Sequence, residues 1–357
     1  MEVLQAGLRI FLGLMPVLCF LLALVALDSY KLVRRQTVAV VLVAGGAAAL
    51  LSLATNLFLL RTAHVDALIL ARLAAPTVEE LLKGLVAATL IARRRVGFLV
   101  DAAIVGFAAG AGFATVENIH YLAVLGKAPI ILWVVRGFGT ALMHGSVTAI
   151  MAVLSKQISD RQGHSPIWVF LPGLLLAAAL HALFNRFLVS PAASTVLLLL
   201  VLPVFFVLIF QISEHRTRDW LGTGFDTDAE LLGLIGAGKV SDSRIGAYLR
   251  ELKTRFPATT VADMVCLLRL RLELSIKAKG ILLARQAGFS LPPDPDVEER
   301  FAEIRYLEQS IGATGLLALK PVLNINDRDL WQYHMLHRAP ESSGGGPANG
   351  GATEADS

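Results

Sequence analysis

The sequence predicts an all-α protein: a polytopic membrane helical bundle of about seven spans, followed by a C-terminal cytoplasmic helical domain. The chain of 357 residues is 55% hydrophobic and only 17% charged, with a mean hydropathy of +0.64, whereas soluble domains carry about 25% charged residues. The charge is also unevenly divided. Residues 1–211 carry 15 Lys and Arg against 8 Asp and Glu, while residues 212–357 carry 17 against 20. This change predicts that the membrane domain ends at Gln211, and it assigns the basic excess to membrane loops rather than to nucleic-acid binding.

A bilayer span needs about 20 mostly apolar residues, and seven stretches of the sequence approach this requirement. They are residues 4–27, 38–60, 66–92, 97–124, 129–154, 166–188 and 193–211. Basic residues, such as Arg93, Arg94 and Arg95, gather after the first, third and fifth stretches, and cytoplasmic loops are the ones enriched in Lys and Arg. We therefore expect a cell (inner) membrane protein with its N-terminus outside and its C-terminal domain in the cytoplasm.

Polar and ionisable side chains are concentrated in the third to sixth expected spans. An ionisable group in the hydrocarbon costs about 2.5–3.5 kcal/mol on insertion, so such a group marks a functional site. Those far from any end are Glu79, Glu80, Lys83, Glu117, Asn118, Arg136, His144, His181 and Asn185. At about 1.5 Å per residue they share a layer from mid-membrane toward the outer leaflet. A buried cluster of this kind can support general acid–base chemistry or hold a metal ion.

Two adjacent glutamates, Glu79 and Glu80, lie at different sequence distances from Lys83. Glu79 lies four residues before Lys83 and Glu80 lies three residues before it, so either can approach the ammonium group. One carboxylate can pair with Lys83 and leave the other free, and the sequence leaves open which one does. Pro76, one turn earlier, predicts a kink that opens room for water.

Two further spacings bear on the same layer. His181 and Asn185 are four residues apart, so both can face one cavity. Gly106, Gly110 and Gly112 predict close packing of the fourth expected span against its neighbours.

Four motifs in this region resemble those of the PrsW family of intramembrane proteases. In order along the chain they are E-E-x-x-K at residues 79–83, G-F-x-x-x-E-N at residues 112–118, an R…H pair at Arg136 and His144, and H-x-x-x-N at residues 181–185. The resemblance covers about residues 70–190. In the related CAAX prenyl endopeptidases the first motif reads E-E-x-x-x-R, so the lysine here and its spacing favour the PrsW branch.

The resemblance implies hydrolysis of a peptide bond of a membrane-anchored protein, and the best-known role of the family is regulated intramembrane proteolysis of an anti-sigma factor. By position, Glu79 or Glu80 would activate water, while His144 and His181 would stabilise the oxyanion or bind a metal. Asn185 would orient His181 or hold the oxyanion. Glu117 would be a second carboxylate or a metal ligand. The supporting positions would be Lys83, Asn118 and Arg136.

The cofactor is open at this point. The sequence lacks the H-E-x-x-H pattern of zincins, which favours a glutamate-activated water. Zinc held by His144, His181 and Glu117 is the alternative. We expect a single-span membrane protein as the substrate.

The C-terminal part predicts a separate helical domain over residues 212–338. Amphipathic periodicity runs through residues 228–320 and is broken by "SLPPDPD" at residues 290–296. This domain would be either a scaffold or a module that binds a cytoplasmic partner. Residues 339–357 are rich in Gly, Ser and Pro, which predicts a disordered tail.

Two other classes of function stay open from the sequence. A proton- or cation-coupled transporter would use the same buried carboxylates, although the inverted repeats common in transporters are not evident. A non-catalytic membrane receptor or scaffold would signal through the C-terminal domain. The Ala- and Gly-rich composition favours a bacterial source.

Overall fold

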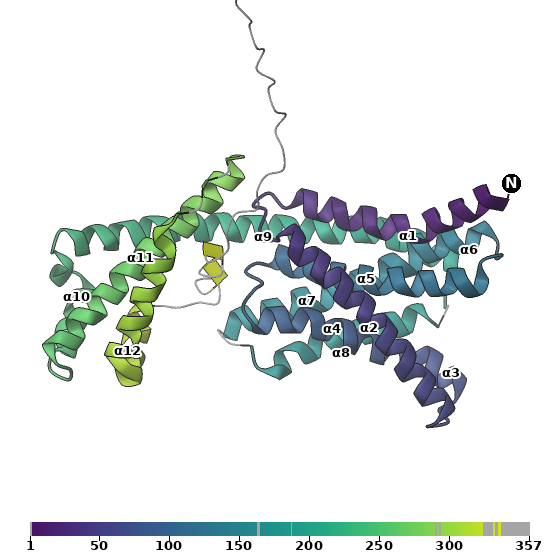
Figure 1. Ribbon diagram of the computed structural model, residues 1–357, viewed down its shortest axis with the longest axis horizontal. Coiled ribbons are helices and arrows are strands. Elements are labelled where there is room, and N and C mark those ends of the chain that lie inside the picture. The colour runs from purple at the N-terminus through teal and green to yellow at the C-terminus, as the bar shows by residue number, and fades with distance from the viewer. Residues whose placement is uncertain are drawn as a thin grey trace, which may run out of the picture.

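The computed structural model describes residues 2–162, 165–186, 188–289, 291–292, 294–323, 331–332 and 335–336, and within these ranges every regular element is helical. In the N-terminal lobe the elements are α1 (Glu2–Leu27), α2 (Arg35–Arg61), α3 (Ala67–Ile69), η1 (Leu70–Ala74), α4 (Ala75–Ala92), α5 (Leu99–Leu125), α6 (Ile130–Val134), η2 (Val135–Ala141), α7 (Leu142–Gln162), η3 (Ile167–Phe170) and α8 (Leu171–Phe184). They are followed by α9 (Pro191–Gly236), η4 (Val240–Asp242), α10 (Arg244–Leu252), α11 (Ala258–Gln286) and α12 (Asp296–Leu323). Figure 1 shows two lobes joined by α9, which confirms the predicted all-α class.

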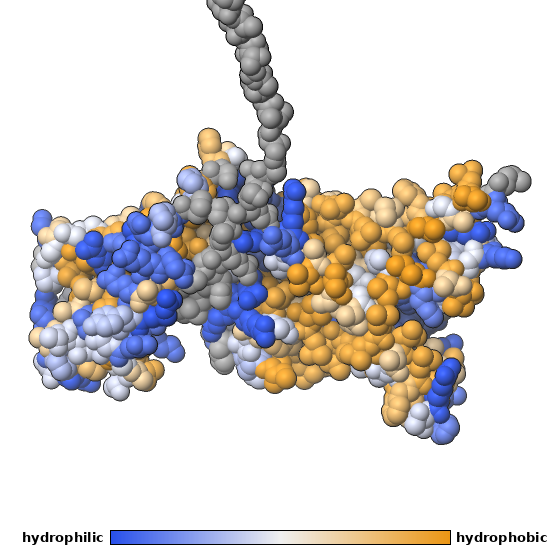
Figure 2. Space-filling model, in the orientation of Figure 1, coloured by the Kyte–Doolittle hydropathy of each residue, from blue (hydrophilic) through white to orange (hydrophobic). Residues whose placement is uncertain are grey.

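Six helices in the described part of the chain are long and apolar enough to cross a membrane. They are Glu2–Leu27, Arg35–Arg61, Leu99–Leu125, Ile130–Gln162, Ile167–Phe184 and Pro191–Gly236. Figure 2 shows an apolar surface over most of the N-terminal lobe, whereas the lobe of α10 to α12 is largely hydrophilic. The structure is therefore a polytopic membrane bundle with an appended helical lobe.

The third expected span, residues 66–92, differs from a regular membrane helix. It folds as α3, the π-helical turn η1 and α4, and the 18 residues of α4 include Glu79, Glu80 and Lys83. Three charged side chains are too many for a helix surrounded by lipid. The helix instead packs against α2, α5, α7 and α8, so its charged face is turned into the protein.

Helix α5 forms the centre of the membrane lobe, and almost all of it up to Ala114 is buried. Its glycines bring neighbouring backbones into contact, as the sequence predicted. A Cβ added at Gly106 or Gly110 would collide with the backbone of α7, and one at Gly112 would collide with Leu42 on α2. The close packing of α5 on α7 fixes the relative positions of the polar groups that these two helices carry.

Two π-helical turns, η1 and η2, stand directly before the polar segments of their helices. Pro76 lies in the first turn of α4 immediately after η1 and has no N–H to donate there. His144 lies three residues beyond the last residue of η2. Within η2, Gly137 and Gly139 allow close approach to α1 and α9, where added Cβ atoms would meet Leu12 and Thr195. Single π turns inside helices occur frequently at functional sites.

Helix α9 runs for 46 residues and passes the predicted boundary at Gln211 without interruption. The C-terminal lobe has a hydrophobic core of its own, formed by residues of α10, α11 and α12 such as Met264, Leu267 and Phe301. Trp331 also contacts the membrane lobe, where its ring centroid lies 5.3 Å from that of Phe98. The boundary at residue 211 stays a prediction, and the expected disordered tail, residues 339–357, lies outside the described residues.

Candidate active site

The polar residues predicted from the sequence lie where α4, α5, η2, α7 and α8 meet. Eight of the nine are joined by hydrogen bonds or ion pairs into one network. These eight are Glu79, Glu80, Lys83, Glu117, Asn118, Arg136, His144 and His181. The network is drawn from four segments that are far apart in the sequence, so only the folded bundle assembles it.

Glu80 is the buried centre of the network, with 1% of its side chain exposed. Its Oε1 accepts a hydrogen bond from Lys83 Nζ at 2.5 Å and lies 2.7 Å from His181 Nδ1. Thr148 Oγ1 lies 3.3 Å from Glu80 Oε2 and 2.9 Å from the backbone oxygen of His144. Both carboxylate oxygens of Glu80 therefore have partners within the network.

Glu79 is the less constrained of the two adjacent carboxylates. Its side chain is 14% exposed, and among the described residues its ion pairs within 4.0 Å are limited to His181 Nε2 at 3.7 Å. Lys83 pairs with Glu80, three residues away, and not with Glu79, four residues away. In the structure Lys83 therefore pairs with Glu80, and Glu79 keeps only a longer contact to His181 among the described residues.

The two histidines face their neighbours with different ring nitrogens. Lys83 Nζ lies 2.9 Å from His144 Nδ1, and because an ammonium group only donates, neutral His144 carries its proton on Nε2, which lies 3.2 Å from Glu117 Oε2. His181 has the opposite arrangement, since its Nδ1–H donates to Glu80 and leaves the Nε2 lone pair directed to the side of Glu79. The hydrogen-bond network thus assigns a donor to His144 and an acceptor to His181.

Arg136 joins the second carboxylate to the edge of the bundle. Its guanidinium donates to Glu117 Oε2 at 3.0 Å and to Asn118 Oδ1 at 2.8 Å. Asn118 Nδ2 in turn donates to the backbone oxygen of Gly13 on α1 at 2.7 Å. The centroid of the Tyr121 ring lies 3.7 Å from the guanidinium carbon of Arg136. These contacts restrain Glu117 as the partner of Arg136 and His144.

Three side chains of the site were not singled out from the sequence. Thr148 bonds to its own helix as many helical threonines do, so nothing in the sequence distinguishes it. Tyr121 lies near the end of its span, where tyrosine is common at a membrane interface. Phe113, with its ring 5.1 Å from that of His144 and 4.6 Å from Lys83 Nζ, lies four residues before Glu117. It is the phenylalanine of the G-F-x-x-x-E-N motif, so the sequence marked its position without giving it a role.

Asn185 occupies a different place from the other predicted residues. It is the C-cap of α8, and its backbone N–H donates to the oxygen of His181 at 3.0 Å. In the described part of the chain no side-chain hydrogen bond joins Asn185 to the network. Its predicted role in holding the oxyanion or orienting His181 stays a prediction.

The donor atoms that lie close together include a set that fits a divalent metal. Glu79, His144 and His181 each offer one atom, and these atoms lie within 4.8 Å of one another. Two imidazole nitrogens and a carboxylate oxygen are a typical catalytic zinc set, with one position left for water. The hydrogen bond from His181 Nδ1–H to Glu80 also matches the carboxylate support that metal-bound histidines receive. The sequence expected Glu117 as the third ligand, whereas the structure places Glu79 in that set.

Comparison with known proteins points to the same part of the chain. Residues 33–210 match a family model described as PrsW family intramembrane metalloprotease. The match includes all nine predicted site residues. No curated protein and no solved structure shows a significant match to the chain.

Proposed function

Through residues 33–210 this chain belongs to the PrsW family of intramembrane proteases, and we propose that it hydrolyses a peptide bond of a membrane-anchored protein with Glu79 as the group that activates water. Membership in a protease family makes the protein an enzyme of the membrane. It also removes the support for a transporter or a non-catalytic receptor.

The observation that carries this role is the free carboxylate of Glu79 beside the unprotonated Nε2 of His181. A water molecule between these groups would give its proton to Glu79 as its oxygen attacks the substrate carbonyl. Glu79 would then return the proton to the leaving amine. A positioned general base of this type contributes about 10²–10⁴-fold to a rate.

The other residues of the network would act on the developing oxyanion and on geometry. His144 carries its proton on Nε2, which lies 3.2 Å from Glu117 Oε2, the same oxygen that accepts from Arg136. This donor would stabilise the oxyanion of the tetrahedral intermediate. Lys83 and Glu80 would orient the two histidines. Lys83 donates to His144 Nδ1, and His181 Nδ1–H donates to Glu80.

We propose zinc as the metal of the family description. Glu79, His144 and His181 would hold it, and when bound it would lower the pKa of the attacking water. The metal-free and metal-bound arrangements use the same three side chains. They differ in whether Glu79 accepts the proton or binds the ion, and in His144, which would have to release the proton on Nε2 to bind the ion because its Nδ1 accepts from Lys83.

The orientation proposed from the basic loops places the cut in the outer half of the membrane. Arg93, Arg94 and Arg95 follow the end of α4 that is distant from Glu79, and a loop with three arginines favours the cytoplasmic side. We therefore propose an inner-membrane protein that cuts a single-span substrate near its extracytoplasmic end. An anti-sigma factor is the substrate class we propose, with the C-terminal lobe binding a cytoplasmic partner.

The test is cleavage by the purified full-length protein in liposomes, using a panel of labelled single-span substrates that includes anti-sigma factors. We expect Glu79→Gln to reduce cleavage by about 10²–10⁴-fold. Glu230→Gln, which changes an exposed carboxylate on α9, should cleave like the wild type. Cleavage by Glu79→Gln at the wild-type rate would exclude the proposed base, and mass analysis of the products would locate the cut.

A further inference from the structure

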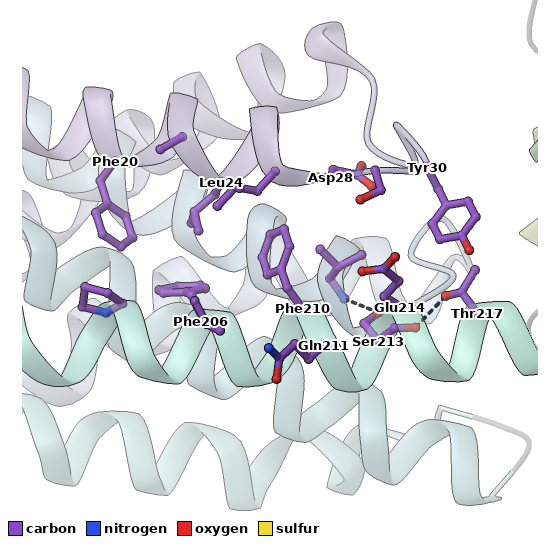
Figure 3. Close-up of a pocket in the computed structure, with 16 residues that line it drawn as sticks. Phe20, Leu24, Asp28, Tyr30, Phe206, Phe210, Gln211, Ser213, Glu214 and Thr217 are labelled. Atoms are coloured by element: carbon purple, nitrogen blue, oxygen red, sulfur yellow. Dashed lines mark hydrogen bonds between the residues drawn. The ribbon is translucent and has the colours of Figure 1, made fainter. Parts of the chain in front are cut away.

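A cavity of about 370 Å³ lies between α1 and α9, apart from the catalytic network. None of the nine predicted site residues lines it. Its walls are largely apolar and come from both helices, as Figure 3 shows for Phe20 and Leu24 on one side and Phe206 and Phe210 on the other. Nothing in the proposed proteolytic mechanism uses this space.

The apolar end of the cavity has a rigid wall. Phe20, Phe107 and Phe206 are mutual neighbours, with ring centroids 5.1 to 5.7 Å apart. Phe107 and Phe206 are almost completely buried, and Phe107 belongs to the central helix α5. These rings keep α1 and α9 apart at this level, so the cavity is part of the packing of the bundle.

The opposite end of the cavity is polar and acidic. Asp28, only 5% exposed, and Glu214 both line it. Asp28 Oδ2 accepts the backbone N–H groups of Leu32 and Val33 at 2.6 and 3.3 Å, but in the described part of the chain no cationic side chain pairs with it within 4.0 Å. Burial raises the pKa of Asp28, and the hydrogen bonds from the backbone of Leu32 and Val33 offset part of that effect.

A second polar group at this end is also incompletely satisfied. Tyr30 is 3% exposed, and its buried hydroxyl has no partner at hydrogen-bonding geometry among the described residues. The guanidinium of Arg218, which pairs with Glu214 Oε1 at 3.2 Å, is its charged neighbour. In the loop that carries Tyr30, the backbone N–H of Lys31 donates to the backbone oxygen of Asp28 at 3.1 Å. The backbone of Lys31 is left-handed, with φ of 47°. The polar end therefore offers carboxylates, a phenol and a nearby guanidinium.

We propose that this cavity binds one membrane lipid whose headgroup carries a primary ammonium, as phosphatidylethanolamine does, with an acyl chain between α1 and α9. The polar end lies where the apolar run of α9 gives way to Gln211 and Glu214. This is the depth at which a headgroup meets an acyl chain. A primary ammonium supplies three N–H donors to the two carboxylates, and the lipid phosphate faces Tyr30 and Arg218.

The acidic groups of the site favour this lipid over two other common membrane lipids. A choline headgroup has the same charge but no N–H donor, so it leaves the carboxylates without hydrogen bonds. A glycerol headgroup brings a net negative charge toward Asp28 and Glu214. We therefore infer selectivity for phosphatidylethanolamine over phosphatidylcholine and over phosphatidylglycerol.

The test is native mass spectrometry of the full-length protein after delipidation and addition of each lipid separately. The wild type should retain phosphatidylethanolamine at least several-fold more than the other two lipids. Ala23→Trp, which fills the cavity, should abolish that excess. Leu22→Trp, at an exposed position of α1 that does not line the cavity, is the matched control and should keep it.

A second pair of changes tests the headgroup contact without changing shape. Asp28→Asn combined with Glu214→Gln should reduce the preference for phosphatidylethanolamine over phosphatidylcholine to near parity. Equal retention of the three lipids by the wild type, preference for phosphatidylglycerol, or equal binding by the two Trp variants would overturn the proposal. The double variant keeps the test informative if Ala23→Trp does not fold.

Discussion

Lys83 Nζ lies 2.5 Å from Glu80 Oε1 on the same helix, and the two side chains are 0% and 1% exposed. Removing one partner of a buried ion pair is more harmful than the pair is favourable, because it leaves an uncompensated charge away from water. The pair therefore gives two adjacent glutamates different surroundings: Glu80 is held by Lys83, whereas Glu79, the proposed base, makes a longer contact to His181.

This difference between the two glutamates predicts different effects when each is substituted. Glu80→Gln leaves Lys83 buried without its carboxylate and should lower the free energy of unfolding by about 3–5 kcal/mol. Glu79→Gln should change it by less than about 1 kcal/mol while removing cleavage, because Glu79 makes one long contact to His181. Thermal or denaturant unfolding in detergent measures both. Equal destabilisation by the two variants would contradict the difference between the surroundings of Glu79 and Glu80.

Metal analysis distinguishes the two ligand sets. If Glu79, His144 and His181 hold the ion, then Glu79→Gln and His181→Ala should lose bound zinc in elemental analysis of purified protein. Glu117→Gln should keep it, because Glu117 is paired with Arg136. A chelator should stop cleavage by the wild type, and added zinc should restore it. Zinc lost from Glu117→Gln but kept by Glu79→Gln would favour the set predicted from the sequence.

The contact between α5 and α7 predicts a strong effect of one added methyl group. A Cβ at Gly110 would collide with the backbone of His144 and Gly145. Gly110→Ala should therefore cost about 1–3 kcal/mol of stability and reduce cleavage, because His144 is displaced. Gly7→Ala on α1 meets no atom within 4 Å and is the control. It should be neutral or stabilising by about 0.5–1 kcal/mol, and similar losses in both variants would argue against a packing effect.

The proposed orientation can be measured with single cysteines. Cys19 and Cys266 are replaced by serine, and Arg94→Cys or Lys127→Cys is added. In intact cells a membrane-impermeant maleimide should label Cys at position 127, and it should label position 94 only after the membrane is opened. The reverse pattern would place the active layer in the cytoplasmic half of the membrane.

The sequence was sufficient to predict the all-α class and the residues of the network, because charged groups are too costly in lipid to be scattered there. It could not decide which glutamate pairs with Lys83, since spacings of three and four residues are both compatible with contact on a helix. Pro76 predicted a kink in the third expected span, but it did not predict the division of that span into α3, η1 and α4. That arrangement depends on packing with α2 and α8. A hydropathy profile reports the composition of one segment and carries no information about such packing.

The unbroken path of α9 determines how the two lobes can influence each other. A helix of 46 residues is about 69 Å long; α9 carries Pro203 in its interior, and its first turns contact η2 through Thr195 and Gly139. A movement of the C-terminal lobe along α9 would therefore reach the bundle next to η2, where Gly139 lies five residues before His144. A partner that turned this lobe would act on the catalytic layer through the helix itself.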